Sequence, residues 1–374
     1  MADTTDAGGR TEAEESEEAA DVSRRRPAPA SGLAALFPGY FALVMATGIV
    51  AIGARLENLD WLDDVLFAIA ALGYIVLAVL MTMRAVRYPR LVLADLTSHA
   101  RGFAFLTAVA ATNVLGAASG VVQGWWGLAW VLWFIGIAVW PILLYITLVA
   151  VVLGGSKPGL ESGINGTWFL LTVSTESIAV LGALLLRRGD NDVLAFTCVA
   201  LFCLGLVLYL IVMTMVFLRW TFASLEPSEA DPPAWIAAGA VAIIVLAGSN
   251  LLLAQDAATR IARVAPAIEI AVVLAWATAT FWFPLMVAIG VWRHVIRRVP
   301  LRYHPSYWAL VFPLGMYGVA TSRMIDATDV TALDWLPPLV FGIALGAWTL
   351  TFAGLAGSAS HVWRGGPATA SRKP

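Results

Sequence analysis

Two charged residues stand inside stretches of the sequence that are otherwise apolar. Glu176 lies in VSTESIAVLGA (173–183), and Arg323 lies in ATSRMIDA (320–327). A charged side chain at the centre of a bilayer costs at least about 2.5–3.5 kcal/mol, so such a residue faces a cavity or a partner. Arg323 could supply positive potential for an anionic solute, and Glu176 could tune that potential or carry a proton. Alternatively, the two could pair with each other, or Arg323 could extend outward beside Asp326.

Five stretches share a hydroxyl residue that is followed by a small or polar residue. The copies lie roughly 60 to 75 residues apart, which is the length of one helical hairpin. The hydroxyl residues are Thr47, Thr112, Thr175, Ser249 and Thr321, and their followers are Gly48, Asn113, Glu176, Asn250 and Ser322. A single threonine in a membrane helix often bonds only to its own backbone. Five copies at matched depth instead favour a polar ring, so we expect these residues to line a pore.

A proline interrupts one of these stretches, YWALVFPLGMYGVATSRMI (307–325). Pro313 has no N–H and clashes with the carbonyl of Ala309, so it predicts a kink. Backbone dipoles exposed by a kink are tolerated where a helix lines a cavity. Phe312 precedes the proline, and taken alone it is interpreted as ordinary packing.

The elements that must position these residues are membrane helices. The 374-residue chain is 60% hydrophobic and only 13% charged, with a mean hydropathy of +0.81, whereas soluble domains carry about 25% charged residues. A helix needs roughly 20 apolar residues to cross a bilayer. We predict ten spans, at 37–56, 62–83, 101–119, 125–153, 164–186, 193–218, 234–254, 264–292, 306–325 and 335–357. The expected fold class is therefore an all-α polytopic membrane protein with odd spans inside and even spans outside.

The basic residues favour one orientation of these spans. The segments before the odd spans and after the last span hold most of the arginines, and this bias places both termini in the cytoplasm of a cell with the chain in its inner membrane. Residues 1–30, acidic and then basic, cannot bury apolar surface and predict a disordered cytoplasmic tail. We assign 31–360 to a transmembrane transport domain and 361–374 to a second cytoplasmic tail.

Several classes of chemistry lack their usual residues. Cys198 and Cys203 are five residues apart and do not face each other on a helix, so they predict neither a disulfide nor a metal pair. The sequence contains no GxxxxGK[ST], HExxH or GxSxG element, and all four histidines fall in predicted cytoplasmic segments. We expect no cofactor, no metal and no enzymatic activity. The net charge of −2 gives no reason to expect a nucleic-acid partner.

FPGYFALVMATGIV (37–50) and YWALVFPLGMYGVAT (307–321) together resemble one family. This is the tellurite-resistance and dicarboxylate transporter family, which includes malic acid transporters, sulfite pumps and plant slow anion channels. The resemblance implies ten helices in five hairpins, odd helices around a central pore, and a homotrimer with one pore in each subunit. It also implies that Phe312 beside Pro313 is a pore gate. Glu176 and Arg323 depart from the charge-poor pores of this family, which argues against a purely passive pore.

The sequence thus favours transport of small anions across a membrane. The solute would be a malate-like C4-dicarboxylate or an oxyanion such as tellurite or sulfite, driven by its gradient or coupled to protons. A passive anion channel gated by Phe312 is the alternative. An intramembrane enzyme and a receptor without transport are the alternatives from other classes.

Overall fold

The computed structural model describes residues 32–155, 157–224, 226–227 and 232–363. The chain divides into residues 1–36 and residues 37–374, and the described part of the first unit holds the 3₁₀ turn Gly32–Ala35. Residues 1–30 and residues 364–374 of the predicted tails lie outside the described residues. The last helix continues to Trp363, beyond the predicted domain limit at residue 360.

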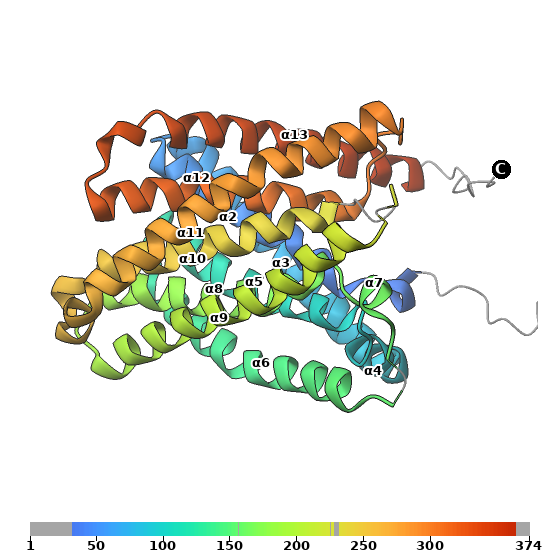
Figure 1. Cartoon of the computed structure of the whole chain (residues 1–374), viewed down its shortest axis with the longest axis horizontal. Coiled ribbons are helices and arrows are strands. Elements are labelled where there is room, and N and C mark those ends of the chain that lie inside the picture. The colour runs from blue at the N-terminus through green and yellow to red at the C-terminus, as the bar shows by residue number, and fades with distance from the viewer. Residues whose placement is uncertain (1–31, 156, 225, 228–231, 364–374) are drawn as a thin grey trace, which may run out of the picture. The chain divides into compact units, whose positions relative to one another are not determined.

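A helix occupies each of the ten predicted spans, and the described residues form no strand. Five of these helices alternate with five others along the chain (Figure 1). The first set is α2 (Ala42–Leu56), α5 (Leu106–Val121), α8 (Leu170–Leu186), α10 (Ile236–Leu252) and α12 (Trp308–Thr328). The second set is α3 (Asp60–Arg87), α6 (Trp126–Leu153), α9 (Asp192–Phe222), α11 (Thr259–Val291) and α13 (Leu336–Trp363). Two short helices, α4 (Pro89–Leu96) and α7 (Leu160–Gly163), both lie toward the right-hand end of Figure 1.

The first set is buried and the second is exposed. In α2, α5, α8 and α10, with the turns that precede them, 72–100% of the most apolar stretch is buried, whereas in the second set only 17–39% is. Nine helices of the described chain are long and apolar enough to cross a membrane, and α12, which carries Arg323 and Asp326, is not among them. Most of α12 is nevertheless buried. The inner helices are buried, and the outer helices expose apolar side chains. This arrangement is expected of a bundle whose outer layer faces lipid.

The inner helices close into a ring. Following contacts around it, α2 packs against α5, α5 against α8, α8 against α10, α10 against α12, and α12 against α2. Each outer helix packs against the inner helix of its own hairpin and also against an inner helix of an adjacent hairpin. Five hairpins thus form two concentric layers, and the inner ring surrounds a common axis.

Each inner helix is preceded by the same kind of turn. It is a 3₁₀ turn that begins with Pro or Gly and ends with an aromatic residue directly before the helix. Proline is tolerated there because the first N–H groups of a helix have no partner within the helix to lose. The turns are Pro38–Phe41, Gly102–Phe105, Gly166–Phe169, Pro232–Trp235 and Pro305–Tyr307. We call the end of the ring where these turns lie the N-side, and the opposite end the C-side.

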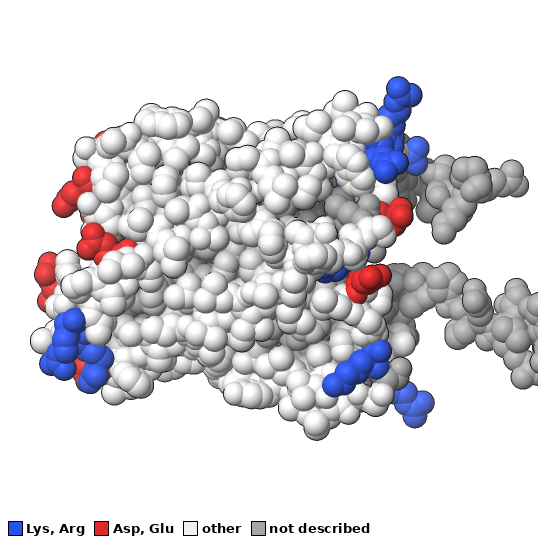
Figure 2. All heavy atoms as spheres, in the orientation of Figure 1, with Lys and Arg blue, Asp and Glu red and all other residues white. Residues whose placement is uncertain are grey.

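Charged side chains gather at the two ends of the bundle. Figure 2 shows blue and red side chains at both ends and a wide band between them without charge on the visible face. Such a band matches the apolar layer of a bilayer, where exposed charge is costly.

Candidate functional site

A series of cavities follows the axis of the inner ring. The cavity at the N-side, of about 60 Å³, is lined from all five turns or helix starts. One lining residue from each is Tyr40, Thr107, Thr167, Ile236 and Ala309. We call this cavity the N-side mouth; it has few polar groups and no acidic or basic side chain other than His304.

The middle cavity is also lined by all five inner helices. It is only about 10 Å³, roughly the space of one water molecule. One lining residue from each helix is Ile49, Asn113, Ser177, Leu246 and Met316. The amide nitrogen of Asn113 donates to the hydroxyl of Ser177 at 3.2 Å. The axis is therefore narrow and mainly apolar at this level, with one amide and one hydroxyl in its wall.

The cavity at the C-side is the largest, at about 400 Å³. Three arginines line it, Arg187 and Arg188 at the end of α8 and Arg323 on α12, together with Trp126. We call it the C-side mouth. Arg323 bonds to Asp326 at 2.9 Å, as one of the alternatives expected. The other alternative, a pair with Glu176, is wrong, because neither carboxyl oxygen of Glu176 has a hydrogen-bond partner in the described chain.

The hydroxyls of the repeat do not face this axis. Each of the four threonines bonds an aromatic side chain of an outer helix, at distances of 2.8–3.1 Å. The pairs are Thr47 with Trp348, Thr112 with Tyr74, Thr175 with Trp140, and Thr321 with Trp276. An indole or phenol buried in a membrane needs a polar partner, and the threonines supply it. The expectation that these threonines line the pore is corrected: they join the inner layer to the outer one.

The hydroxyls also do not form one level. Thr47 and Thr175 each lie six residues after the last residue of the preceding turn, Phe41 or Phe169. Thr321 lies 14 residues after the last residue of its turn, Tyr307. The helix starts meet around the N-side mouth, so a difference of eight residues displaces Thr321 by about 12 Å at 1.5 Å per residue. The repeat in sequence is thus not a ring in space.

The residues that follow the hydroxyls have different surroundings. Asn113 lines the middle cavity, and Gly48 packs against Val114, which its added Cβ would approach to 2.8 Å. Asn250 is 2% exposed and lies four residues after Leu246, hence on the same side of α10. Ser322 lines a separate small pocket and not the axis.

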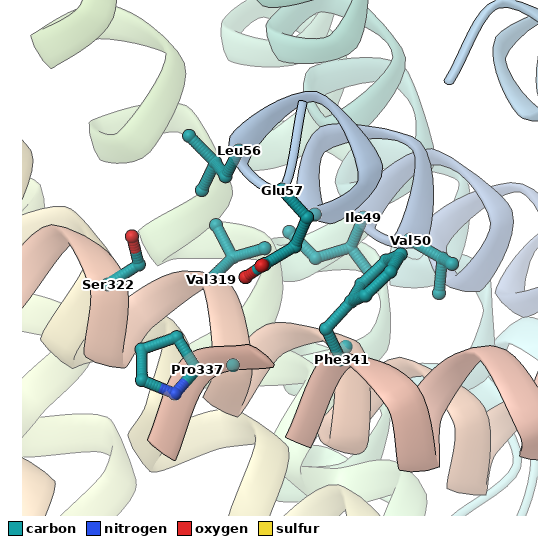
Figure 3. A pocket seen from close by; sticks show the side chains of 11 residues that line it. Ile49, Val50, Leu56, Glu57, Val319, Ser322, Pro337 and Phe341 are labelled. Carbon is teal, nitrogen blue, oxygen red and sulfur yellow. The ribbon is translucent and has the colours of Figure 1, made fainter. Parts of the chain in front are cut away.

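The pocket at Ser322 lies between α2, α12 and α13. Figure 3 shows the carboxyl group of Glu57 directed into it beside Val319. Burial raises the pKa of the Glu57 carboxyl above its ordinary value. Only two inner helices, α2 and α12, line this pocket, together with the outer helix α13, so it lies off the axis of the ring.

Glu176 is fully buried, but it is directed toward α9. A Cβ added to Gly205 of α9 would overlap the carboxyl group of Glu176, and the next residue, Ser177, takes the place on the axis. Within the described chain neither carboxyl oxygen has a hydrogen-bond partner. Glu176 therefore occupies the interface between the inner and outer layers, beside the pore wall.

The contact between α9 and α10 is the exception in the aromatic pairing. Ser249 on α10, which packs against α9, is buried and has no hydrogen-bond partner among the residues described. No aromatic residue of α9 bonds it, in contrast to the four threonines. Sequence reasoning missed both the aromatic partners and Gly205, although a Trp or Tyr near the middle of four outer spans was a signal that could be read.

Phe312 lies on the axis side of α12. It is 2% exposed, and it comes three residues after Ala309 of the N-side mouth and four before Met316 of the middle cavity. These spacings keep all three on one helix face. Pro313 packs against Gly239 of α10, and α12 continues through it. Phe312 thus shares the helix face of Ala309 and Met316, although it is not itself among the residues that line either cavity.

The described residues contain no group of three His, Cys, Asp or Glu side chains that could hold a metal ion. Polar contacts with a solute along the axis would come from Asn113, Ser177, Asn250 and the arginines of the C-side mouth.

Comparisons with known proteins agree with a transport fold. Residues 36–356 match a family described as voltage-dependent anion channel. An uncharacterized transporter of Methanocaldococcus jannaschii is 24% identical over 325 residues, which cover 84% of this chain and 90% of the relative. An uncharacterized membrane protein of Mycobacterium tuberculosis is 38% identical over 148 residues, 40% of this chain and 75% of the relative.

Proposed function

The chain belongs to the voltage-dependent anion channel family, and from this premise we propose that it moves small anions across a membrane along the axis of its five inner helices. The observation that carries this proposal is the series of cavities on one axis, two of them lined from all five inner helices or the turns before them. The third cavity carries three arginines, which favour anions over cations.

The path would run from one mouth to the other past Phe312 and the middle cavity. A small apolar constriction with an amide and a hydroxyl can pass an anion that exchanges part of its water shell for these groups. Phe312 fills the space between the N-side mouth and the middle cavity, so its rotation would open the path.

The proposed solutes are a malate-like C4-dicarboxylate or an oxyanion such as tellurite or sulfite. Movement would follow the solute gradient or be coupled to protons, with Glu176 as the residue that carries the proton. A charge without a partner is expensive in this interface, so Glu176 is suited to a step in which it gains or loses a proton. A passive channel opened by Phe312 is the alternative proposal.

The remaining proposals concern the setting of the molecule. The N-side would face the cytoplasm, because the segments there hold most of the arginines, and the chain would be a homotrimer in the inner membrane. We propose neither enzymatic activity nor a receptor role without transport.

Reconstitution in proteoliposomes tests the function. Uptake of malate, nitrate, chloride and sulfite is measured with and without a proton gradient. The proposal expects uptake of at least one of these anions above that of empty liposomes. Absence of uptake of every one by correctly folded protein would contradict it, and a response to the proton gradient would separate coupled transport from a passive channel.

A further inference from the structure

The C-side mouth is the most strongly charged of the three cavities on the axis. Its volume is about 400 Å³, and its lining includes Arg187, Arg188 and Arg323. The other two cavities on the axis hold no arginine or lysine. The path is therefore electrostatically asymmetric, with its positive charge at one end.

Two of the three guanidinium groups have no acidic partner. Arg323 bonds to Asp326, but no carboxylate of the described chain forms an ion pair with Arg187 or Arg188. Arg188 lies over the ring of Trp126 at 4.1 Å from the ring centre, a stacking that holds the guanidinium plane at the cavity wall. The mouth keeps about two positive charges that nothing in the described chain neutralises.

No carboxylate is among the residues that line the mouth. Two acidic residues toward this end of the bundle pair with other arginines: Asp63 with Arg55 at 2.6 Å, and Asp192 with Arg260 at 2.7 Å. Glu57 lines the separate pocket of Figure 3. Asp190, two residues after Arg188, is exposed and forms no ion pair with either arginine of α8 in the described chain. The guanidinium groups of Arg187 and Arg188 are thus left for a ligand.

We propose that the C-side mouth is a binding site for a small dianion with oxygen acceptors, a dicarboxylate or a sulfate-like oxyanion, before it enters the narrow axis. The inference rests on the proposed function, and it names the class of solute which that pathway would collect. Guanidinium groups fit such ligands because their planar forks donate two parallel hydrogen bonds to one carboxylate or oxyanion. The cavity volume accommodates an ion of this size.

Charge makes the site selective for dianions. A guanidinium about 5 Å from an anion, in the dielectric of water, changes the affinity for a monoanion about fourfold. For a dianion the interaction energy with the guanidinium is twice as large. The change in affinity is therefore the square of the fourfold change, about 16-fold. Removal of one arginine therefore weakens binding of sulfate or malate much more than binding of chloride.

Equilibrium binding tests the site without relying on transport. Isothermal titration of the full chain in nanodiscs with sulfate, malate or chloride compares wild type with Arg187→Gln, Arg188→Gln and the double variant. Arg263→Gln is the matched control, because Arg263 is exposed near the start of α11 and does not line the mouth. We expect each single variant to weaken sulfate and malate binding about 16-fold and chloride binding about fourfold, and the control to change neither.

Two results would overturn the site. The first is an affinity for sulfate that is the same in wild type and in the arginine variants, provided that these variants unfold at the wild-type temperature without added anion. The second is a loss of sulfate affinity in Arg263→Gln that equals the loss in Arg187→Gln or Arg188→Gln. Flux in proteoliposomes separates this failure from that of the proposed function. Unchanged uptake and unchanged preference for dianions in the double variant would reject the site alone, whereas no uptake of any anion by wild type would reject the pathway.

Discussion

At the scale of single residues, side-chain direction decides which residues of the repeat can contact a solute. Thr175 bonds outward to Trp140, Glu176 lies against Gly205, and Ser177 lines the middle cavity. Consecutive residues on a helix are rotated by about 100°, so three neighbours have three surroundings. In α8, the residue that lines the axis is Ser177, which follows the repeat position Glu176.

Replacement of the ring between the N-side mouth and the middle cavity tests the gate. We expect Phe312→Ala to increase anion current, because it removes the group that separates the two cavities. Leu314→Ala is the control, since Leu314 is on the same helix but is rotated by about 200° from Phe312 and therefore lies on another face. Patch-clamp recording of reconstituted protein measures the effect; a current equal to or below wild type in folded protein would remove Phe312 from the mechanism.

Replacement of the buried carboxyl group tests proton coupling. Glu176→Gln keeps the size of the side chain, but its amide group does not gain or lose a proton in the pH range in which a carboxyl group does. If Glu176 carries the proton, solute uptake becomes indifferent to a pH gradient while uptake along the solute gradient persists. Uptake is measured in proteoliposomes with and without that gradient, and coupling that survives in the variant would assign Glu176 a structural role.

Replacement of the arginine on α12 tests the potential at the C-side mouth. Arg323→Ala is expected to weaken anion flux, because it leaves Asp326 without its partner beside the path. The double variant Arg323→Ala/Asp326→Ala also removes the carboxylate. Recovery of anion flux in the double variant would assign the effect to the unpaired Asp326, and persistent loss of flux would assign it to the missing positive charge. Anion flux and preference that match wild type in Arg323→Ala would return the residue to a structural role.

At the scale of elements, the bundle depends on contacts between its inner and outer layers. Four aromatic side chains of the outer helices bond threonines of the inner helices, and α9 instead brings a glycine against Glu176. Small residues let two helices approach closely in a membrane, where hydrophobic burial does not drive association. The four bonds all join an inner helix to the outer helix of an adjacent hairpin, whereas Gly205 and Glu176 meet within one hairpin, where the α8–α9 contact depends on shape.

Loss of one aromatic donor should weaken its layer contact slightly. Trp140→Phe leaves the hydroxyl of Thr175 without the indole donor, at a cost of about 0.6–1.5 kcal/mol. Trp130→Phe is the control, because Trp130 is on the same helix and forms no such bond to an inner threonine. Unfolding in detergent measures both, and equal stability of Trp140→Phe and wild type would show that the bond contributes nothing.

A methyl group at the α8–α9 contact should be poorly tolerated. Gly205→Ala overlaps the carboxyl group of Glu176 and is expected to cost about 1–3 kcal/mol by overpacking. Gly346→Ala on α13, where an added Cβ meets nothing within 4 Å, controls for helix propensity. Partial recovery of stability in the double variant Gly205→Ala/Glu176→Ala would assign the loss to this contact. Stability of Gly205→Ala equal to that of wild type would contradict the packing described.

At the scale of the whole molecule, the sequence predicts the layers better than it predicts the site. Runs of about 20 apolar residues and their alternation give the ten helices, because lipid leaves the backbone no other structure. Spacing along the chain does not report rotation about a helix, so it could not show that Thr47 and Thr175 bond the outer layer and do not face the axis. The place of Arg187 and Arg188 could not be predicted from the sequence, since only the fold brings the end of α8 beside α12.

The central claim is that solute passes on the axis side of α8, at Ser177. Ser177→Cys and Thr175→Cys are compared in a Cys198→Ser/Cys203→Ser background, with nitrate uptake by proteoliposomes measured before and after addition of Ag⁺, a small ion that binds thiolates. The pathway described predicts that Ag⁺ blocks uptake through Ser177→Cys and leaves Thr175→Cys and the background unaffected. Block of Thr175→Cys without block of Ser177→Cys, or no block of either, would contradict it.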